Sequence, residues 1–327
     1  MGRVVLVTGV SGALASRVSR ALAELGESGG VDRVVGIDMR PPAGELGGVK
    51  FVRADIRTPV VAKVMAVEDV DTVVHLDLAP AESRGGSGAK ERNVIGTMQV
   101  LAACQRSQQV TKFVLGSNTA VYGSSPRDPA MFHESDSARG GVRSGFPKDL
   151  VEVEGYARGF ARRRPDIIIT TLRAAQVLHP DIETPFRNYL TNPALPTVIG
   201  FDPRLQFLHL EDALEIITQS VVHDRPGTFN AAGDGVLLLS QIARRLGRPT
   251  LPLPLPGFAP AAGRVIRTMG GQMSPDLHRV LTHGRAVDTS ALREIFGYEP
   301  KYSTEATFEA FRDAVRPGIL SALGGRR

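Results

Sequence analysis

The chain has 327 residues, enough for one large domain with a smaller one beside it. Hydrophobic residues make up 42% and charged residues 22%, a globular composition that excludes long fibrous segments. The net charge of +5 is spread along the sequence, so we expect no nucleic-acid partner. The sequence begins with a strand pattern and has no apolar run of about 18 residues, so we expect a cytoplasmic protein without membrane contact. The single cysteine, Cys104, has no partner for an internal disulfide and is expected in the core.

A strand, a glycine turn and a helix open the chain. Arg3 to Thr8 form an apolar, β-rich run, and the apolar residues from Leu14 to Leu25 recur at helical spacing. Gly9 permits a tight bend between them, and Gly12 lets the backbone approach a diphosphate at the positive end of the helix. This pattern predicts a dinucleotide-binding unit.

Short apolar strands then alternate with helical patterns. Strands are predicted over 33–38, 51–56, 71–76, 112–117 and 166–173, helices over 60–66, 89–108 and from 146 or 147 onward, and a glycine- and serine-rich loop over 83–88. The alternation predicts an α/β fold, a Rossmann-type doubly wound parallel sheet covered by helices on both faces. Asp38 ends the second strand, where such folds place the acid that meets the adenosine ribose. Its carboxylate would repel a 2′-phosphate, so NAD is favoured over NADP, although Arg40 lies close by.

Several motifs occur in the order seen in one protein family. They are Gly9-x-x-Gly12-x-x-Ala15, Asp55-Ile56, Val73-Val74-His75-Leu76, Asn93-x-x-Gly96-Thr97, Val121-Tyr122-Gly123, Leu172-Arg173, Phe207 to Ala213 and Val287-Asp288-Thr289-Ser290. With them the chain resembles, over nearly its whole length, the extended short-chain dehydrogenase/reductases. These are the NAD-dependent epimerase/dehydratase proteins typified by UDP-galactose 4-epimerase. The run Gly145-Phe146-Pro147-Lys148-Asp149 is similar to that of an actinobacterial epimerase-like group.

The resemblance implies which residues surround an NAD cofactor. Gly9, Gly12 and Ala15 would surround the diphosphate, Asp38 would hold the adenosine ribose, Asp55 and Ile56 would flank the adenine, and Lys148 would bind the nicotinamide ribose. The other cofactor-binding residues would be Ser11, Ala13, Leu14, Leu76, Asp77 and Asn93. The family usually has small residues after the histidine, whereas this chain has Asp77 and Leu78. A carboxylate turned toward the diphosphate would repel it. His75 ends an apolar strand, and we expect it to be a hydrogen-bonded structural residue.

The resemblance also implies positions for a catalytic Ser/Thr, Tyr and Lys. In the family the tyrosine exchanges a proton with the substrate, and the lysine four residues later lowers its pKa from about 10 toward neutrality. Lys148, which precedes Glu152 at the usual spacing, puts Ser144 at the tyrosine position. The Val-Tyr-Gly segment puts Asn118, preceded by Ser117, at the Ser/Thr position. Asn118 can still donate a hydrogen bond to a substrate, but an aliphatic hydroxyl at Ser144 ionises too far above neutral pH to replace a phenol.

Proline constrains the start of this helix. Pro147 is tolerated only in the first helical turn, so the helix should begin near Phe146 or Pro147 and leave Ser144 outside it. Other groups would then have to carry the proton. We consider four, each of which also has a structural interpretation: Tyr122, Tyr156, His133 and Glu134.

By resemblance, the substrate-binding part begins after the sixth strand. We expect an NAD(P)-binding domain over 1–175 with a returning segment at 205–232, a smaller substrate-binding domain over 176–204 and 233–320, and a flexible tail over 321–327. Within them we expect a helix and loop over 184–197, a strand and helix over 206–222, an extended Leu-Pro edge segment over 251–256, and short helices over 265–269 and 291–296. Arg204 and Arg285 would meet a substrate diphosphate.

Two functions follow from these observations. The first is an epimerase/dehydratase-like oxidoreductase that acts on a nucleotide sugar or related hydroxylated substrate through a non-standard proton relay. The second is a catalytically impaired dinucleotide-binding sensor or scaffold protein. A chain that binds no dinucleotide, because of Asp77 and Leu78, is a third interpretation. No metal site is expected, and a homodimer is compatible with each function.

Overall fold

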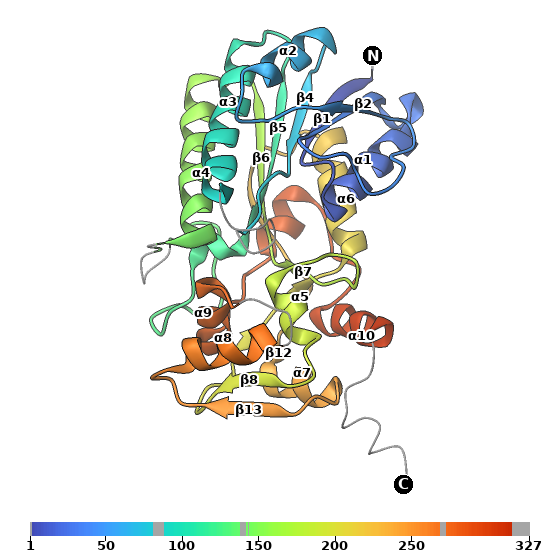
Figure 1. The fold of residues 1–327 in the computed structure, drawn as a ribbon. Helices are drawn as coiled ribbons and strands as arrows, with labels where there is room; N and C mark the ends of the chain where they lie inside the picture. The colour runs from blue at the N-terminus through green and yellow to red at the C-terminus, as the bar shows by residue number, and fades with distance from the viewer. Residues whose placement is uncertain (1, 81–87, 138–141, 143, 269–272, 316–327) are drawn as a thin grey trace.

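The computed structural model describes residues 2–80, 88–137, 142, 144–268 and 273–315. Its centre is a sheet of seven strands in the order β11-β6-β5-β4-β1-β2-β3 (Figure 1). These strands are β1 (Arg3–Thr8), β2 (Val31–Asp38), β3 (Val49–Arg53), β4 (Thr72–His75), β5 (Lys112–Asn118), β6 (Ile168–Ala174) and β11 (Gly227–Ala231). Every pairing in this sheet is parallel, which confirms the predicted doubly wound α/β fold.

The strand order reverses at β1. This strand pairs with β2 on one side and with β4 on the other, so the chain leaves the central strand in both directions. The loops after β1 and β4 diverge at that point and open the crevice in which such sheets bind ligands. β3 ends at Arg53, so Asp55 and Ile56 lie in the turn that follows and not in a strand over 51–56.

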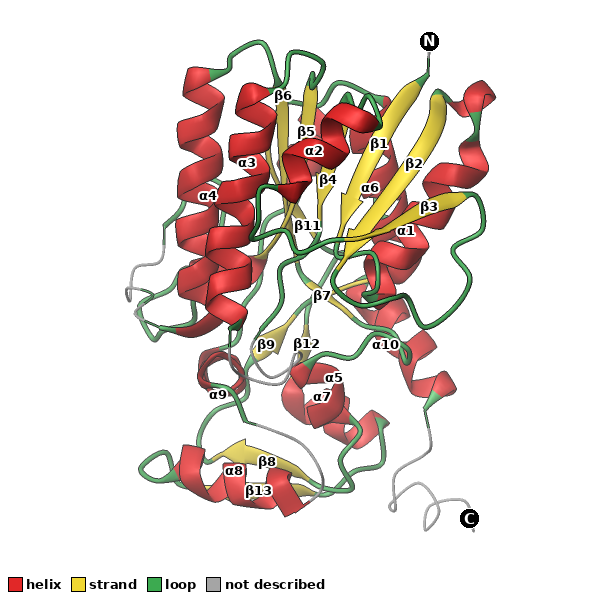
Figure 2. Cartoon of the chain, turned by 45° about the horizontal axis from the view of Figure 1, so that its top comes forward, coloured by secondary structure: helices red, strands yellow, loops and turns green. Residues whose placement is uncertain are grey.

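Helices cover both faces of the sheet (Figure 2). α1 (Ala13–Leu25) and α6 (Leu210–Val222) pack on one face, and α2 (Val60–Val67), α3 (Thr97–Arg106) and α4 (Gly145–Arg163) pack on the other. A π-helical turn, Glu91–Gly96, precedes α3 inside the helix expected over 89–108. Each face has its own hydrophobic core: the first lies between the sheet and α1 and α6, and the second between the sheet and α2, α3 and α4. Along β1, Val5 and Val7 pack in the first core and Leu6 packs in the second, because successive side chains of a strand point to opposite faces. Cys104 is buried in the second core, which confirms its expected place.

A smaller set of elements occupies the lower part of Figure 1 and encloses a third core. Its strands are β7 (Gln176–Val177), β8 (Leu195–Val198), β9 (Arg204–Leu205), β10 (Phe207–Leu208), β12 (Leu237–Leu238) and β13 (Thr250–Leu253). Its helices are α5 (Pro185–Leu190), α7 (Leu239–Arg245), α8 (Phe258–Thr268), α9 (Pro275–His283) and α10 (Thr304–Ala314). The π-helical turn η5 (Leu292–Phe296) instead packs through Leu292 and Phe296 into the core shared by the large sheet, α1 and α6.

The first half of the Leu-Pro segment, residues 251–253, is extended as expected and belongs to β13, whereas the chain bends and turns at 255–256. β13 pairs with β8 in a two-stranded sheet in which both are edge strands. Two predicted elements have the wrong residue ranges. The segment 184–197 contains a strand, β8, and the helix expected over 265–269 begins earlier, at Phe258. Pro260 does not prevent this because it lies in the first turn of α8. The glycine-rich loop over 83–87 and the tail lie outside the described residues, and the proposed domain boundaries stay a prediction.

Buried polar side chains fasten the returning helix α6 to its neighbours. Asp212 is fully buried and accepts a hydrogen bond from the Tyr298 hydroxyl (2.7 Å). At the other end of α6, the Lys112 ammonium donates to the carbonyls of Val221 (2.8 Å) and His223 (2.6 Å). These contacts hold α6 against β5 and the C-terminal segment. None of the described helices is long and apolar enough to cross a membrane.

Candidate functional site

A cavity of about 690 Å³ lies at the carboxyl edge of the sheet, where the strand order reverses. Doubly wound sheets bind their ligands at this place. The cavity continues from the turn after β1, past the ends of β4 and β5 and the start of α4, to the smaller set of elements. The predicted site residues on its wall are Gly9, Ser11, Gly12, Ala13, Leu14, Asp38, Leu76, Ser117, Asn118, Ser144 and Arg285.

The glycine turn after β1 forms one end of the cavity. Gly9 has a φ of 73°, a left-handed conformation that glycine adopts easily. The Gly12 amide donates to the Gly9 carbonyl (2.9 Å) and closes the turn. Gly12 caps α1 without a side-chain hydrogen bond, so no side chain of the cap competes for the amides of the first helical turn. The turn therefore fits the diphosphate of a dinucleotide.

Gly9→Ala is expected to weaken NAD binding. An added Cβ would lie 2.9 Å from the Cα of Asp77 and 3.0 Å from its Cβ, so the turn must shift. The loss of one hydrogen bond to a charged diphosphate costs about 1.5–3 kcal/mol, which is roughly 10- to 150-fold in Kd. Calorimetric titration with NAD measures the change. Gly30→Ala is the control, because Gly30 also has a positive φ (81°) but its added Cβ meets nothing within 4 Å. Unchanged affinity in Gly9→Ala would contradict the prediction.

Asp38, at the end of β2, is held beside the glycine turn. Its Oδ2 accepts a hydrogen bond from the Ser11 amide (3.2 Å), and its Oδ1 accepts one from the Arg40 amide (3.2 Å). Asp38 and Arg40 both line the cavity. A carboxylate at this point would bind ribose hydroxyls and repel a 2′-phosphate, and the neighbouring guanidinium offsets part of that repulsion.

Asp77 lies behind the glycine turn. The residue is 4% exposed and packs against Gly9 through its Cα and Cβ. Its neighbours Leu76 and Leu78 line the cavity, whereas Asp77 is not part of the described wall. The repulsion expected from a carboxylate that faces the diphosphate therefore has no basis in this arrangement.

The two residues expected at the adenine lie outside the described wall of the cavity. Asp55 forms an ion pair with Arg57, with 2.7 Å between Oδ2 and Nη2, and the hydrogen bonds from Arg57 lower the pKa of Asp55. Ile56 is buried, and its side chain packs closely against Gly96. Their contact with an adenine stays a prediction.

Asn93 and His75 hold the segment around β4 in place. Asn93 accepts a hydrogen bond from the Ala79 amide (3.2 Å) and donates to the Ala79 carbonyl (3.0 Å). The two ring nitrogens of His75 each lie 2.8 Å from a hydroxyl, one of Thr8 and one of Thr97. His75 is fully buried and hydrogen-bonded, as expected of a structural histidine. Asn93 lies outside the described cavity wall, so its contact with the cofactor stays a prediction.

The cavity brings together Asn118 and Ser144 but not Lys148. Asn118 accepts a hydrogen bond from the Ala120 amide through Oδ1 (2.8 Å), which leaves its side-chain NH₂ group as a donor. Ser144 is the N-cap residue of α4 and precedes the helix, as predicted. The Lys148 side chain is 45% exposed, its ammonium lies 3.8 Å from Glu152, and it is outside the described wall. Its predicted contact with the nicotinamide ribose would require a different orientation of the side chain.

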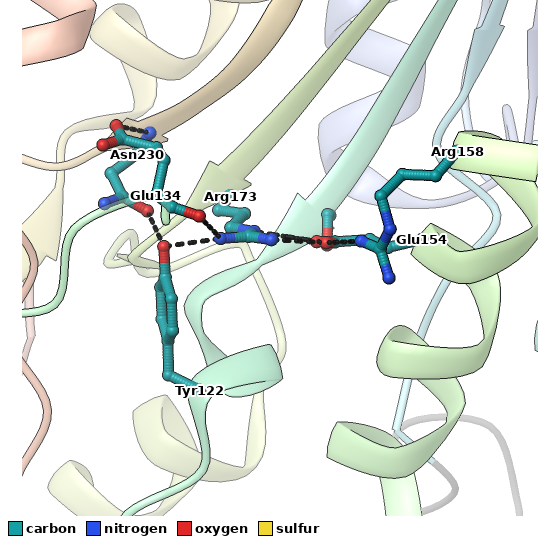
Figure 3. Close-up of polar contacts among 7 residues, drawn as sticks. Tyr122, Glu134, Glu154, Arg158, Arg173 and Asn230 are labelled. Atoms are coloured by element: carbon teal, nitrogen blue, oxygen red, sulfur yellow. Dashed lines mark hydrogen bonds and ion pairs between the residues drawn. The ribbon is translucent and has the colours of Figure 1, made fainter. Parts of the chain in front are cut away.

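A buried ion pair sets the orientation of α4 (Figure 3). Glu154 is 2% exposed, and the Arg173 guanidinium from β6 donates to its carboxylate through Nε (3.1 Å) and Nη2 (2.7 Å). The Ser117 hydroxyl, at the end of β5, donates to the same carboxylate (2.7 Å). Burial acts to lower the pKa of Arg173, but the hydrogen bonds and charge of Glu154 outweigh it and the pKa is raised. Glu154 therefore fixes α4 to β5 and β6.

This orientation determines which residues of α4 face inward. Residues four apart share a helix face, so Leu150 and Phe146 lie on the face of Glu154. Leu150 is 1% exposed, and Phe146 lines the cavity. By resemblance the family acid follows the lysine by four residues and the tyrosine by eight. Counted from the buried Glu154 instead of Glu152, those positions hold Leu150 and Phe146, which sequence reasoning missed.

The four groups considered as replacement proton carriers lie outside the described cavity wall. Tyr122 is buried and donates to Asn230 (2.7 Å), and burial raises the pKa of Tyr122 to about 12. Glu134 accepts a hydrogen bond from the Asn230 amide (2.8 Å). The His133 side chain is 63% exposed, and Tyr156 lies on the exposed face of α4. Tyr122 and Glu134 thus have structural partners.

The two arginines expected at a substrate diphosphate have different surroundings. Arg285 lines the cavity, but its Nη2 lies 2.6 Å from an oxygen of Asp276, and its Nε donates to the Gly123 carbonyl (2.7 Å). Arg204 is exposed and lies outside the described wall of this cavity. The Nε/Nη2 edge of Arg285 is therefore occupied by protein partners, and Arg204 is not part of the described wall.

Comparison with known proteins identifies the family. The model of the NAD dependent epimerase/dehydratase family matches residues 5–232. The chain belongs to this family. Over 329 residues it is 42% identical to the uncharacterized protein Rv0501 of Mycobacterium tuberculosis (strain ATCC 25618 / H37Rv). This match covers 98% of this chain and 85% of the relative.

Solved structures of epimerases and dehydratases share the fold of this family member. DesIV, a dTDP-glucose 4,6-dehydratase from Streptomyces venezuelae with NAD and TYD bound, has a TM-score of 0.71 at 21% identity, over 95% of this chain and 97% of that one. UDP-glucose 4-epimerase from Thermotoga maritima, with UDP-glucose, has a TM-score of 0.70 at 18% identity and the same coverage of both chains. At these identities the similarity concerns the fold.

Proposed function

We propose that the chain is an NAD-binding oxidoreductase, epimerase/dehydratase-like, that acts on a hydroxylated small molecule. The observation that carries the proposal is one continuous cavity, which runs from the glycine turn past Asn118 and Ser144 to the smaller set of elements. A site for a dinucleotide alone would not need the second half. Nucleotide sugars are the first substrates to test, because the Thermotoga maritima epimerase of the same fold carries UDP-glucose. A cytoplasmic location and a homodimer belong to the same proposal.

The residues on the cavity wall would have different roles in such a reaction. Bound NAD would supply the hydride acceptor. Asn118 would donate a hydrogen bond to the reacting oxygen of the substrate and orient it. The substrate proton must leave by a non-standard relay, because the Ser144 hydroxyl has too high a pKa to act as a base near neutral pH and the Phe146 side chain has no ionisable group.

NAD is expected to raise the melting temperature more than NADP at equal concentration. A ligand present at 100 times its Kd stabilises a protein by about 2.7 kcal/mol. Asp38 repels the 2′-phosphate of NADP, so Asp38→Asn should narrow the difference between the two cofactors. Asp166→Asn is the matched control, since Asp166 pairs with Arg164 outside the cavity (2.7 Å). Absence of any shift with millimolar NAD would refute the proposal and favour the interpretation without a dinucleotide.

A second candidate, a catalytically impaired NAD-binding sensor or scaffold, is favoured by a different observation. Phe146 lines the cavity from α4, whereas Lys148 lies outside the described wall. Phe146 at this inward position would contact a ligand without transferring a proton, and the buried Leu150 replaces the family lysine with an apolar core residue. Turnover of any hydroxylated substrate by the wild-type protein separates the two candidates.

A further inference from the structure

The half of the cavity beyond Asn118 is walled mainly by apolar side chains. Phe186 of α5, Phe207 of β10, and Leu277 and Val280 of α9 contribute to it, together with Phe146 of α4. Apolar walls of this kind bind the apolar body of a ligand, and a few polar groups fix its orientation.

The cation on this half of the wall is already neutralised. Arg285 is nearly buried, with its side chain 9% exposed, and its Nη2 lies 2.6 Å from Asp276. Its Nε donates to the Gly123 carbonyl (2.7 Å), so the Nε/Nη2 edge of the guanidinium is occupied at both nitrogens. That edge is one of those through which arginine binds a phosphate bidentately. A diphosphate would have to displace the Asp276 carboxylate to use it.

The other charged side chains on this half are acids. Asp181 and Glu183 also line the cavity, and among the described wall residues beyond Asn118 the only cation is Arg285. Asp181 forms an ion pair with Arg17 of α1 (2.8 Å), and Arg17 itself is not part of the described wall. A ligand with two negative charges would therefore meet no cation that lacks a carboxylate partner among the described wall residues of this half, and the loss of its hydration without such a partner opposes binding.

We propose that this half of the cavity takes an uncharged hydroxylated substrate with an apolar body, and that Asp276 is the residue that excludes diphosphates. The inference rests on the proposed function and narrows its substrate class. It depends on a contact between α9 and Arg285 that is independent of the dinucleotide turn.

Two probes that share one sugar test the inference. Phenyl β-glucoside is uncharged and has an apolar group, whereas UDP-glucose carries the same sugar on a diphosphate. Each is added at equal concentration to the protein saturated with NAD, and the further rise in melting temperature is measured. We expect a rise with phenyl β-glucoside and none with UDP-glucose. A rise with UDP-glucose that equals or exceeds the other, or no rise with either probe, would overturn the inference.

Variants at Asp276 make the test specific. Asp276→Ala and Asp276→Asn remove the carboxylate that pairs with Arg285, so UDP-glucose should gain at least tenfold in affinity, while phenyl β-glucoside should change less than twofold. Two substitutions are used because Asp276 lies in the first turn of α9 and also supports that helix. Asp166→Asn, an Asp–Arg pair outside the cavity, is the control. Unchanged UDP-glucose affinity in both Asp276 variants would refute the role of Asp276. The rise in melting temperature on addition of NAD alone tests the proposed function, and the further rise with each probe tests the substrate class. Failure of the proposed function and failure of this inference are therefore distinguishable.

Discussion

Phe146→Tyr is expected to raise NADH formation from a hydroxylated substrate by about 10²–10⁴-fold, the usual contribution of a positioned general acid or base. The substitution adds one hydroxyl to a side chain that already lines the cavity beside Ser144. Lys148 lies outside the described wall, so the new phenol should keep a pKa near its ordinary value of about 10. Because the phenolate is the active base, the rate should rise with pH up to about that value. NADH fluorescence with UDP-glucose and phenyl β-glucoside as substrates measures it.

Two further tyrosine variants control this experiment. Ser144→Tyr tests the alignment through Lys148, and we expect a smaller gain because Ser144 precedes the helix. Val151→Tyr places a phenol on the exposed face of α4 and should change nothing. A measurable wild-type rate that Phe146→Tyr does not exceed would mean that the chain has its own proton carrier, and the sensor or scaffold candidate would fail. A gain confined to Ser144→Tyr would show that the alignment through Glu154 is wrong.

Glu154→Ala is expected to destabilise the fold by about 3–5 kcal/mol, the usual effect of removing one partner of a buried ion pair. The Arg173 side chain is only 8% exposed and would keep its charge without the carboxylate that binds it. The Ser117 hydroxyl would lose its acceptor as well. Equilibrium unfolding in urea measures the change in the free energy of unfolding.

Glu152→Ala is the matched control for this prediction. Glu152 lies two residues earlier on the same helix and makes a longer contact with Lys148 (3.8 Å), and both side chains are partly exposed. Exposed pairs of this kind contribute about 0–1 kcal/mol. If Glu154→Ala and Glu152→Ala cost the same, Glu154 does not fix α4 to the sheet, and the inward position of Phe146 needs another explanation.

The fold could be predicted from the sequence because its signals are local. Apolar strands, the Gly9 turn and the helix that follows each depend on neighbouring residues, and their alternation restricts the sheet to a parallel, doubly wound one. The elements of the smaller set were harder to predict. α8 begins seven residues earlier than expected, since a proline in a first turn gives the same sequence signal as a helix breaker.

The dinucleotide end of the candidate site was also accessible from the sequence, because its residues follow directly from strand ends. Gly9, Gly12 and Asp38 all lie on the cavity wall. The direction of the Asp77 side chain was ambiguous from the sequence. Asp77 follows β4, which ends at His75, so strand alternation no longer sets the direction of its side chain, and only the packing against Gly9 decides it.

By itself, then, the sequence determined the doubly wound sheet, the glycine turn and the absence of tyrosine at the position counted from Lys148. The tertiary structure decided which face of α4 points inward and what Arg285 binds. Two residues of a helix correspond to about 200° of rotation, so counting from Glu152 or from Glu154 places opposite faces toward the cavity. Arg173 comes from β6 and Asp276 from α9, and these contacts across separate elements, not any local pattern, select the orientation of α4 and the partner of Arg285.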